Sequence, residues 1–406
     1  MRKRLLLALA APALVLAMSE TAGRIWLVHF AGDDVFLGLC SPTQFERYGS
    51  GRSRFMLHPY LRYALEPGFE RDGTCINNLG YRGEPVALPK PHGEYRIVCM
   101  GGSTTFDDTI ERDEDAFTAR LQYHLRQEGC RVSVLNAGVP GWMSYESLIN
   151  YAFRVAYLEP DLIIPLLVWN DLTARLVHPP EAYRGDNTGV RQVHLGSFPL
   201  WERPLLVRAP LVAAGLIEPQ MIRLVFGHAP TLRAADFPYG PFYEEHSLAE
   251  MLENNPPRYF RANLRHLAAM AEADGAQTLF ITFPFSRTPK AFQDCFGIAP
   301  EDYTLYQVVL DAFDEMNAAV KSVAEERQAL FFDLAAAYPN PDDYTELFAD
   351  GFHNNPAGAD LKATMRLQPQ DAPRVFREIE QVKKNFRALE TLGVAASARA
   401  EALSGQ

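Results

Sequence analysis

Five short apolar runs, separated by stretches with helical periodicity, occupy the chain from residue 95 onward. The runs are continuous rather than alternating, which is typical of strands buried on both faces of a parallel sheet. They cover residues 95–100, 132–136, 162–168, 278–283 and 330–333, and the helical stretches cover 117–127, 144–157, 259–273 and 303–326. Repeated strand-then-helix units predict an α/β fold: a three-layer, doubly wound domain with a five-stranded, mainly parallel sheet.

Three other segments flank or interrupt this domain, which we place at residues 94–370. Residues 27–93 are rich in Gly, Pro and aromatic residues, and we expect an irregular amino-terminal extension there. A long stretch at about 172–257 follows the third strand as an insertion, and a loop of that length is usually functional. At 371–406, apolar residues at helical spacing predict a helical tail packed on the body.

Charge and cysteine usage narrow the class of partners. The 406 residues include 39 basic and 50 acidic ones, giving a net charge of −11 with no concentrated basic patch, so nucleic acid is not expected as a partner. The five cysteines and the histidines of the insertion lack metal-ligand spacing, and we expect neither a metal nor a cofactor. Cys40 and Cys75 could pair in an oxidising compartment, although the odd count makes no disulfide framework.

The first 26 residues have the composition of an export signal. Arg2, Lys3 and Arg4 precede fourteen uncharged residues at 5–18, and small residues follow. This pattern fits a cleaved signal peptide, and it also fits a membrane anchor at residues 5–18, although a full span needs about 20 apolar residues. Either alternative predicts that the bulk of the chain is exported, to the periplasm or the extracytoplasmic face of the membrane.

Two distant segments together supply the groups of a serine nucleophile. The first apolar run ends in Gly101, Gly102 and Ser103, which puts a hydroxyl at the carboxyl end of a strand, the edge where open α/β sheets bind ligands. Far downstream, Asp350 precedes His353 by three residues, so a carboxylate and an imidazole can meet in one loop. These residue types are a nucleophile, its base and the acid that orients the base.

Two more segments reach the same sheet edge. Residues 136–142 follow the second strand as a glycine-containing turn, and Asn170 follows the third strand. A backbone N–H and an Asn side-chain amide are suitable donors to the oxyanion of a tetrahedral intermediate. The sequence therefore predicts an oxyanion hole beside Ser103.

In this chain order, the four segments resemble the SGNH hydrolases, also called the GDSL superfamily, whose blocks carry Ser, Gly, Asn and a paired Asp-x-x-His. The resemblance implies a flavodoxin-like SGNH fold without a cofactor. It assigns the nucleophile to Ser103, the block-two glycine to Gly141, the block-three asparagine to Asn170, and the last block to Asp350 and His353. The N–H groups of Ser103 and Gly141 and the Asn170 amide would then form the oxyanion hole.

Two positions depart from the family pattern or leave a choice within it. Gly102 stands where the family's Gly-Asp-Ser has Asp. Gly138 is a rival for the block-two position, and the spacing from Asn136 favours Gly141. Upstream, residues 77–82 look like a lead-in found in many exported bacterial members.

The resemblance implies an exported serine esterase that acts on carboxylic esters, with acyl or acetyl groups on cell-envelope glycans or lipids as the expected substrates. Two alternatives stay open. An O-acyltransferase would use the same residues to pass the acyl group to a polysaccharide hydroxyl. A non-catalytic glycan-binding or assembly protein could keep the fold without the chemistry.

The insertion is expected to cap the site, because it leaves the sheet directly after Asn170 and loops at that edge carry specificity. The alternative is a satellite subdomain over the far face of the sheet. Aromatic residues near the predicted site and in the insertion are candidates for binding a sugar or acyl group: Trp142, Trp169, Trp201 and Tyr243.

The export prediction can be tested with fusions. Alkaline phosphatase joined after residue 60 should be active, because the basic leader stays in the cytoplasm and the chain beyond the apolar run crosses the membrane. A reporter that works only in the cytoplasm should be inactive at the same junction. The reverse pair of results would contradict export.

Overall fold

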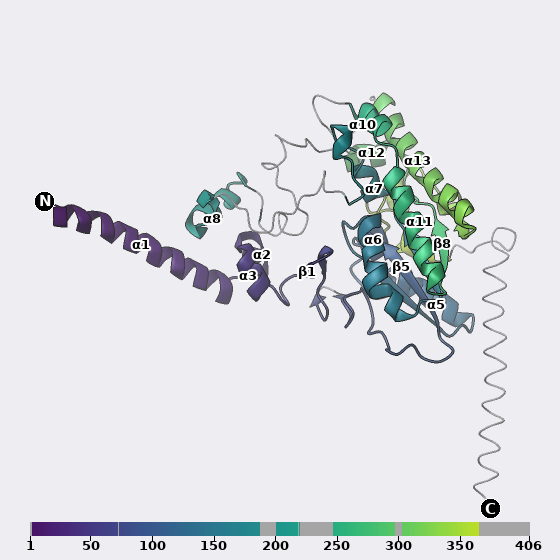
Figure 1. Ribbon diagram of the computed structural model, residues 1–406, viewed down its shortest axis with the longest axis horizontal. Helices are drawn as coiled ribbons and strands as arrows, with labels where there is room; N and C mark the ends of the chain where they lie inside the picture. Colours follow the sequence, from purple (N-terminus) through teal and green to yellow (C-terminus); the bar gives the residue numbers. More distant parts are fainter. Residues whose placement is uncertain are drawn as a thin grey trace, which may run out of the picture.

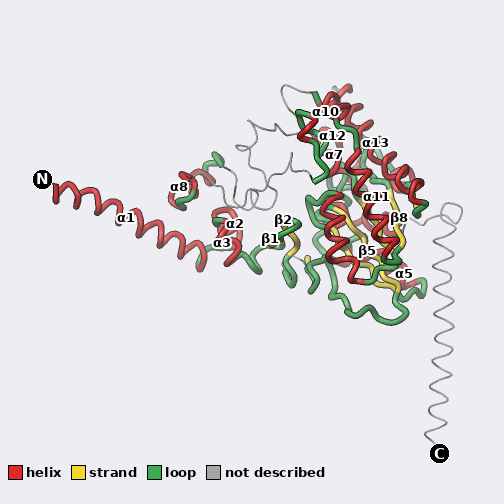
Figure 2. The backbone as a smooth tube through the Cα atoms, viewed as in Figure 1, coloured by secondary structure: helices red, strands yellow, loops and turns green. Residues whose placement is uncertain are grey.

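A five-stranded parallel sheet forms the centre of the computed structural model, which describes residues 2–71, 73–186, 200–217, 219, 247–296 and 303–364 (Figures 1 and 2). All neighbouring strands of this sheet are parallel. The strands are β5 (Tyr95–Gly101), β6 (Val132–Gly138), β7 (Leu162–Leu166), β8 (Gln277–Ile281) and β9 (Leu330–Phe332), in the order β6-β5-β7-β8-β9. The predicted doubly wound α/β class is confirmed, and every predicted strand lies within two residues of an observed one.

The strand order creates a switch point beside β5. Along the chain β5 comes first, β6 lies on one side of it, and β7 to β9 extend on the other. At such a point the loops after neighbouring strands leave in opposite directions, and ligands bind in the crevice between them. Gly101 of β5 pairs with Gly138 of β6 and Leu166 of β7, so the three strands end at one level.

Side chains of the strands enter two cores, one on each face of the sheet. Ile97 and Cys99 join the first core, whereas Val98 and Met100 join the second, and all four are at most 6% exposed. This two-sided burial explains why the strands read as continuous apolar runs. The first core includes helices α5 (Phe117–Gln127), α13 (Tyr303–Arg327) and α15 (Pro356–Thr364), and the second includes α6 (Ser144–Asn150); α11 (Arg258–Ala273) contributes to both.

One predicted helix is interrupted. The stretch at 144–157 begins as α6 but continues as a π-helical turn at Tyr151–Val155 and a 3-10 turn at Ala156–Leu158. Tyr151 and Val155 are fully buried in the second core. Apolar periodicity predicted a helical stretch here and carries no signal for the wider turn.

The amino-terminal extension is not irregular, and that prediction was wrong. It holds helices α2 (Asp33–Leu39) and α3 (Pro42–Tyr48), a hairpin of β1 (Phe55–His58) with β2 (Arg62–Leu65), and a hairpin of β3 (Glu70–Arg71) with β4 (Thr74–Cys75). These elements have two to seven residues, too few to show a period. Phe55, Tyr63 and Leu65 gain burial by packing on Phe106 and Trp142 of the main domain.

Within the insertion, residues 205–213 lie against the first helix, whereas Leu248, Met251 and Leu252 pack in the first core. The backbone N–H groups of Leu205 and Leu206, at the start of α8 (Leu205–Ala213), donate to the Glu20 carboxylate of α1 (Arg2–His29) at 2.8 and 3.0 Å. Figure 1 shows α8 beside α1, away from the central sheet. Among the described helices, none combines the length and apolar composition needed to cross a membrane. The predicted tail at 371–406 lies outside the described residues.

Shorter helices complete the described chain: α4 (Ser103–Phe106), α7 (Trp169–Thr173), α10 (Leu248–Asn254), α12 (Pro289–Phe296) and α14 (Leu334–Ala337). All five cysteines are free thiols, so Cys40 and Cys75 do not pair in this structure. Cys40 is buried in a cluster with α1, α2 and α8, whereas Cys75 lies in β4.

A buried ion pair joins α15 to the loop after α4. Lys362 Nζ lies 3.2 Å from Asp107 Oδ1 and donates to the Thr104 carbonyl at 3.1 Å. The two charged side chains are only 3% and 1% exposed. The second carboxylate oxygen of Asp107 accepts the Phe117 N–H at 2.6 Å, so the group is well compensated although it lies out of water.

Removing one partner of this pair should be costly. Lys362→Met leaves the Asp107 carboxylate buried without its cation, and we expect the free energy of unfolding to fall by about 3–5 kcal/mol. Denaturant titration followed by circular dichroism measures this change. The double variant Asp107→Asn/Lys362→Met should recover most of the loss, because it removes both charges and Asn tolerates the left-handed backbone of residue 107 (φ 61°). An equal loss of unfolding free energy in the single and double variants would contradict the pairing of Lys362 with Asp107.

Candidate active site

Ser103 stands at the point where a strand turns directly into a helix. Strand β5 ends at Gly101, and α4 begins at Ser103 with the Phe106 N–H donating to the Gly102 carbonyl at 3.0 Å. Asp107 ends this single turn in a left-handed conformation, φ 61° and ψ 59°. The hydroxyl is therefore fixed at the carboxyl edge of the sheet, beside the switch point.

A chain of short hydrogen bonds connects Ser103 to a loop 250 residues away. Ser103 Oγ lies 2.7 Å from His353 Nε2, and His353 Nδ1 lies 2.7 Å from Asp350 Oδ2. The other carboxylate oxygen, Asp350 Oδ1, accepts the backbone N–H groups of Phe352 and His353 at 2.9 and 2.7 Å. The loop thus folds around the Asp350 carboxylate. This arrangement holds the imidazole of His353 between that carboxylate and the Ser103 hydroxyl.

The environment of Asp350 keeps its carboxyl ionised. Burial by itself raises the pKa of this group, but hydrogen bonds and the charge of His353, together with the two backbone donors, outweigh burial and hold the pKa below its ordinary value. An ionised Asp350 fixes the proton on His353 Nδ1, which leaves Nε2 free to accept the proton of Ser103.

The turn that carries Gly141 follows β6, which ends level with β5. The Trp142 N–H donates to the Val139 carbonyl at 3.0 Å, which closes a turn with Pro140 second and Gly141 third, and Gly141 has φ 82°. A turn with Pro followed by a residue at positive φ needs glycine in the third place. The rival Gly138 lies within β6, where its N–H donates to Asn136 Oδ1 at 3.1 Å, so Gly141 is the better candidate for an oxyanion donor.

Asn170 reaches the site from the first turn of α7. Its Nδ2 donates to the Trp142 carbonyl at 2.8 Å, which uses one of the two N–H groups of the amide. Ser103 and Asn170 line one small cavity together with Gly102, Trp169 and Phe283. The second N–H is therefore available in the space where the oxyanion of a Ser103 adduct would form.

Close packing explains the glycine before the nucleophile. A Cβ atom at Gly102 would lie 2.6 Å from Asn170 Nδ2 and 3.1 Å from the Trp142 carbonyl oxygen. Contacts under 3 Å do not occur for real Cβ atoms, so any side chain here would displace the Asn170 amide. A side chain such as the family's Asp would therefore not fit at this position without a shift of the Asn170 amide.

The structure brings only some of the predicted binding aromatics to the site. Trp169 lines the cavity and stacks on Phe313 with ring centroids 5.7 Å apart. Trp142 contributes its backbone, but its side chain is fully buried and cannot contact a substrate. Trp201 is 54% exposed beside α8, whose partner is α1, and it is not among the residues that line the cavity. Tyr243 lies outside the described residues.

The model of the GDSL-like Lipase/Acylhydrolase family matches residues 99–361, about two thirds of the chain. The chain belongs to this family. Its Ser103, Asn170, Asp350 and His353 all fall inside the matched region, and the resemblance to the SGNH hydrolases is confirmed at the level of the superfamily.

Solved structures of acylhydrolases resemble the chain only distantly. A GDSL-like lipase from Bacteroides thetaiotaomicron is 13% identical, with 73% of this chain and 92% of that one covered and a TM-score of 0.37. A mutant of an acetyl-xylooligosaccharide esterase from Geobacillus is 16% identical, with 66% and 90% covered and a TM-score of 0.35. No curated protein matches the chain. These similarities by themselves say nothing of what this chain acts on.

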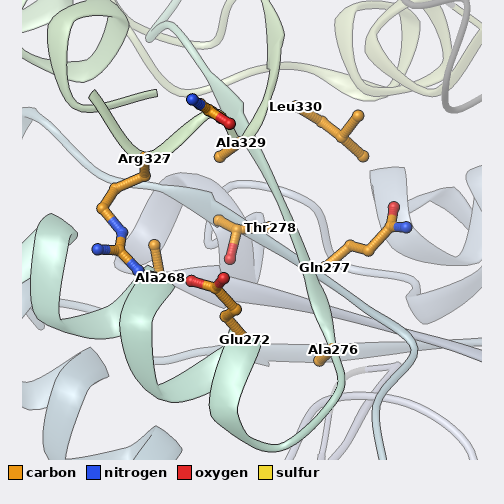
Figure 3. A pocket seen from close by; sticks show the side chains of 9 residues that line it. Ala268, Glu272, Ala276, Gln277, Thr278, Arg327, Ala329 and Leu330 are labelled. Atoms are coloured by element: carbon orange, nitrogen blue, oxygen red, sulfur yellow. Dashed lines mark hydrogen bonds and ion pairs between the residues drawn. The ribbon is translucent and has the colours of Figure 1, made fainter. Parts of the chain in front are cut away.

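A larger cavity lies at the opposite edge of the sheet of this GDSL-like protein, and it has no catalytic groups. It has a volume of about 110 Å³ and lies where β8 and β9 begin, lined by Thr278, Gln277 and Leu330 (Figure 3). Its charged groups, Arg327 and Glu272, pair with each other at 2.5 Å. In the described part of the chain, no group of three or more His, Cys, Asp or Glu residues could hold a metal ion.

Sequence reasoning missed the residues that hold the site together. Thr109 Oγ1 donates to the carbonyl of Asn354, next to His353, at 2.7 Å. Asp171 accepts the Ser144 N–H at 3.0 Å and its hydroxyl at 2.5 Å, which ties the Asn170 turn to the start of α6. No motif marks these residues, because their partners are remote in sequence and their chemistry is ordinary hydrogen bonding.

Gly102→Ala should damage the oxyanion hole selectively. The added methyl group displaces the Asn170 amide, so kcat for ester hydrolysis should fall by about 10- to 100-fold with little change in KM, as expected when one oxyanion donor is lost. Steady-state kinetics on a p-nitrophenyl ester measures both constants. Gly32→Ala is the matched control, because a Cβ there meets nothing within 4 Å. Unchanged kcat in Gly102→Ala would contradict the role given to Asn170.

Proposed function

We propose that this GDSL-like protein hydrolyses carboxylic esters of short acyl groups, with Ser103 as nucleophile. The observation that carries the proposal is the pair of 2.7 Å hydrogen bonds from Ser103 Oγ to His353 Nε2 and from His353 Nδ1 to Asp350. Nucleophile and base within hydrogen-bond reach, with the base oriented by a third group, are the signature of nucleophilic acyl transfer.

The proposed reaction has two halves, acylation of Ser103 and hydrolysis of the acyl-enzyme. Ser103 Oγ attacks the ester carbonyl while His353 Nε2 takes its proton, and Asp350 stabilises the resulting imidazolium. The N–H groups of Ser103 and Gly141 and the Asn170 amide hold the oxyanion. His353 then protonates the leaving alcohol. In the second half, His353 activates a water that attacks the acyl carbonyl and releases the acid and Ser103.

The small size of the cavity supports a short acyl group. The space beside Ser103 is about 10 Å³, enough for about one water molecule. Trp169, Phe283 and Val168 are among the residues that line it. A space of this size suits a short acyl group such as acetyl better than a long alkyl chain.

The proposed setting is outside the cytoplasm, with acyl groups on envelope glycans or lipids as substrates. Support for this setting comes from the basic leader and the uncharged run at residues 5–18. Transfer of the acyl group to a polysaccharide hydroxyl would begin with the same acyl-enzyme, and adding a sugar acceptor to the hydrolysis assay would detect it as a new ester product.

The test compares two esters on two proteins. The wild type should hydrolyse p-nitrophenyl acetate, with kcat/KM at least about tenfold above that for the octanoate ester, because the cavity excludes the longer chain. Ser103→Ala should lose about 10³-fold or more in kcat at unchanged thermal stability. Equal activity of Ser103→Ala and wild type would overturn the proposal, and a preference for octanoate would overturn the short-acyl assignment.

A further inference from the structure

We infer that the amino-terminal extension is a working part of the active site and that Tyr63 is a positioning residue for the oxyanion hole. The extension precedes residue 99, where the family match begins, so nothing in that match assigns it a role. The inference rests on the proposed ester hydrolysis, because it concerns the donors that stabilise the oxyanion of that reaction.

Tyr63 makes hydrogen bonds to the residues on both sides of Gly141 in the turn after β6. Its phenolic O–H donates to the carbonyl of Pro140 at 2.7 Å, and its own carbonyl accepts the indole N–H of Trp142 at 3.3 Å. Pro140 and Trp142 are the immediate neighbours of Gly141. The side chains of Tyr63 and Trp142 are both 0% exposed, so water does not compete for these hydrogen bonds.

The same contact reaches the second oxyanion donor. The Trp142 carbonyl accepts the hydrogen bond of Asn170 Nδ2 at 2.8 Å. The direction in which this carbonyl points is set by the turn, and the turn is held by Tyr63. One residue outside the matched domain thus fixes two oxyanion donors, the Gly141 N–H directly and the Asn170 amide through Trp142.

The extension is itself anchored to the nucleophile's side of the site. The buried Arg82 guanidinium donates to the carbonyls of Phe106 and Ile110 at 2.9 and 2.6 Å and pairs with Asp113 at 2.7 Å. Phe106 is the last residue of α4, the helix of Ser103, and Ile110 and Asp113 lie in the segment that follows it. The extension therefore contacts the turn after β6 through Tyr63 and the loop after α4 through Arg82. These contacts fix the position of the turn relative to the loop.

Preorganised donors explain why these contacts matter for rate. Oxyanion donors stabilise a transition state only when they already point to the place where charge develops, and misplacement by about 1 Å can cost about 10²-fold in rate. If Tyr63 served only to fill the core, its ring would suffice and its hydroxyl would be dispensable for turnover. The hydroxyl is therefore the atom to remove.

The experiment compares Tyr63→Phe with Tyr151→Phe in the full chain. Both tyrosines are 0% exposed and both lose one hydroxyl hydrogen bond, since Tyr151 Oη donates at 3.0 Å to the exposed Asp274, which directly follows α11. We expect Tyr63→Phe to lower kcat on p-nitrophenyl acetate by about 5- to 20-fold with KM within twofold, part of the loss for a removed oxyanion donor. Tyr151→Phe should change kcat less than twofold at a similar shift in melting temperature.

A second readout follows the oxyanion hole without turnover. The rate of covalent labelling by a fluorophosphonate probe should fall in Tyr63→Phe by a factor similar to that in kcat, because the phosphonyl oxygen takes the place of the oxyanion. Equal kcat and labelling rate in Tyr63→Phe and Tyr151→Phe would overturn the inference and leave ester hydrolysis standing, provided that Ser103→Ala is inactive. Absence of turnover and labelling in the wild type would overturn both.

Discussion

The register between β5 and its two neighbours is the constraint on which the rest of the site depends. Because Gly101 pairs with both Gly138 and Leu166, three parallel strands end at the same level, and the segments that follow them must meet. Ser103 follows the first of these strands, Gly141 the second and Asn170 the third. A slip of one residue in either pairing would turn the strand's side chains to the opposite face and separate the donors from the nucleophile.

Asp350 and His353 lie far from Ser103 in the sequence, so separate contacts must hold their loop in place. The Asp350–His353 loop meets Ser103 only after 250 residues, and two contacts hold it there: Lys362 pairs with Asp107, and Thr109 donates to the Asn354 carbonyl. The hydrogen bonds among Ser103, His353 and Asp350 are thus one part of a wider junction between α4, its following loop and α15. This arrangement lets a partly exposed histidine keep a fixed direction toward Ser103.

How far the sequence predicts this site depends on the range of each interaction. The strands, most helices, Ser103 and the Asp350–His353 loop were predicted, because two-sided burial and a three-residue spacing leave local signals. The role of Tyr63 and the burial of Trp142 were not, since both result from the packing of short hairpins that have no detectable period. The position of α8 was not predicted either, because Glu20, about 185 residues away, accepts the hydrogen bonds of its first turn.

The most direct test of the account is the identity of the residue that a fluorophosphonate probe modifies. Intact-mass measurement should show one adduct per chain, and peptide mapping should place it on Ser103 in the segment that joins β5 to α4. His353→Ala should slow its formation by several orders of magnitude, because the hydroxyl then lacks its base. An adduct on another residue, or labelling at an unchanged rate without His353, would contradict the central claim that Ser103 is a nucleophile activated by His353.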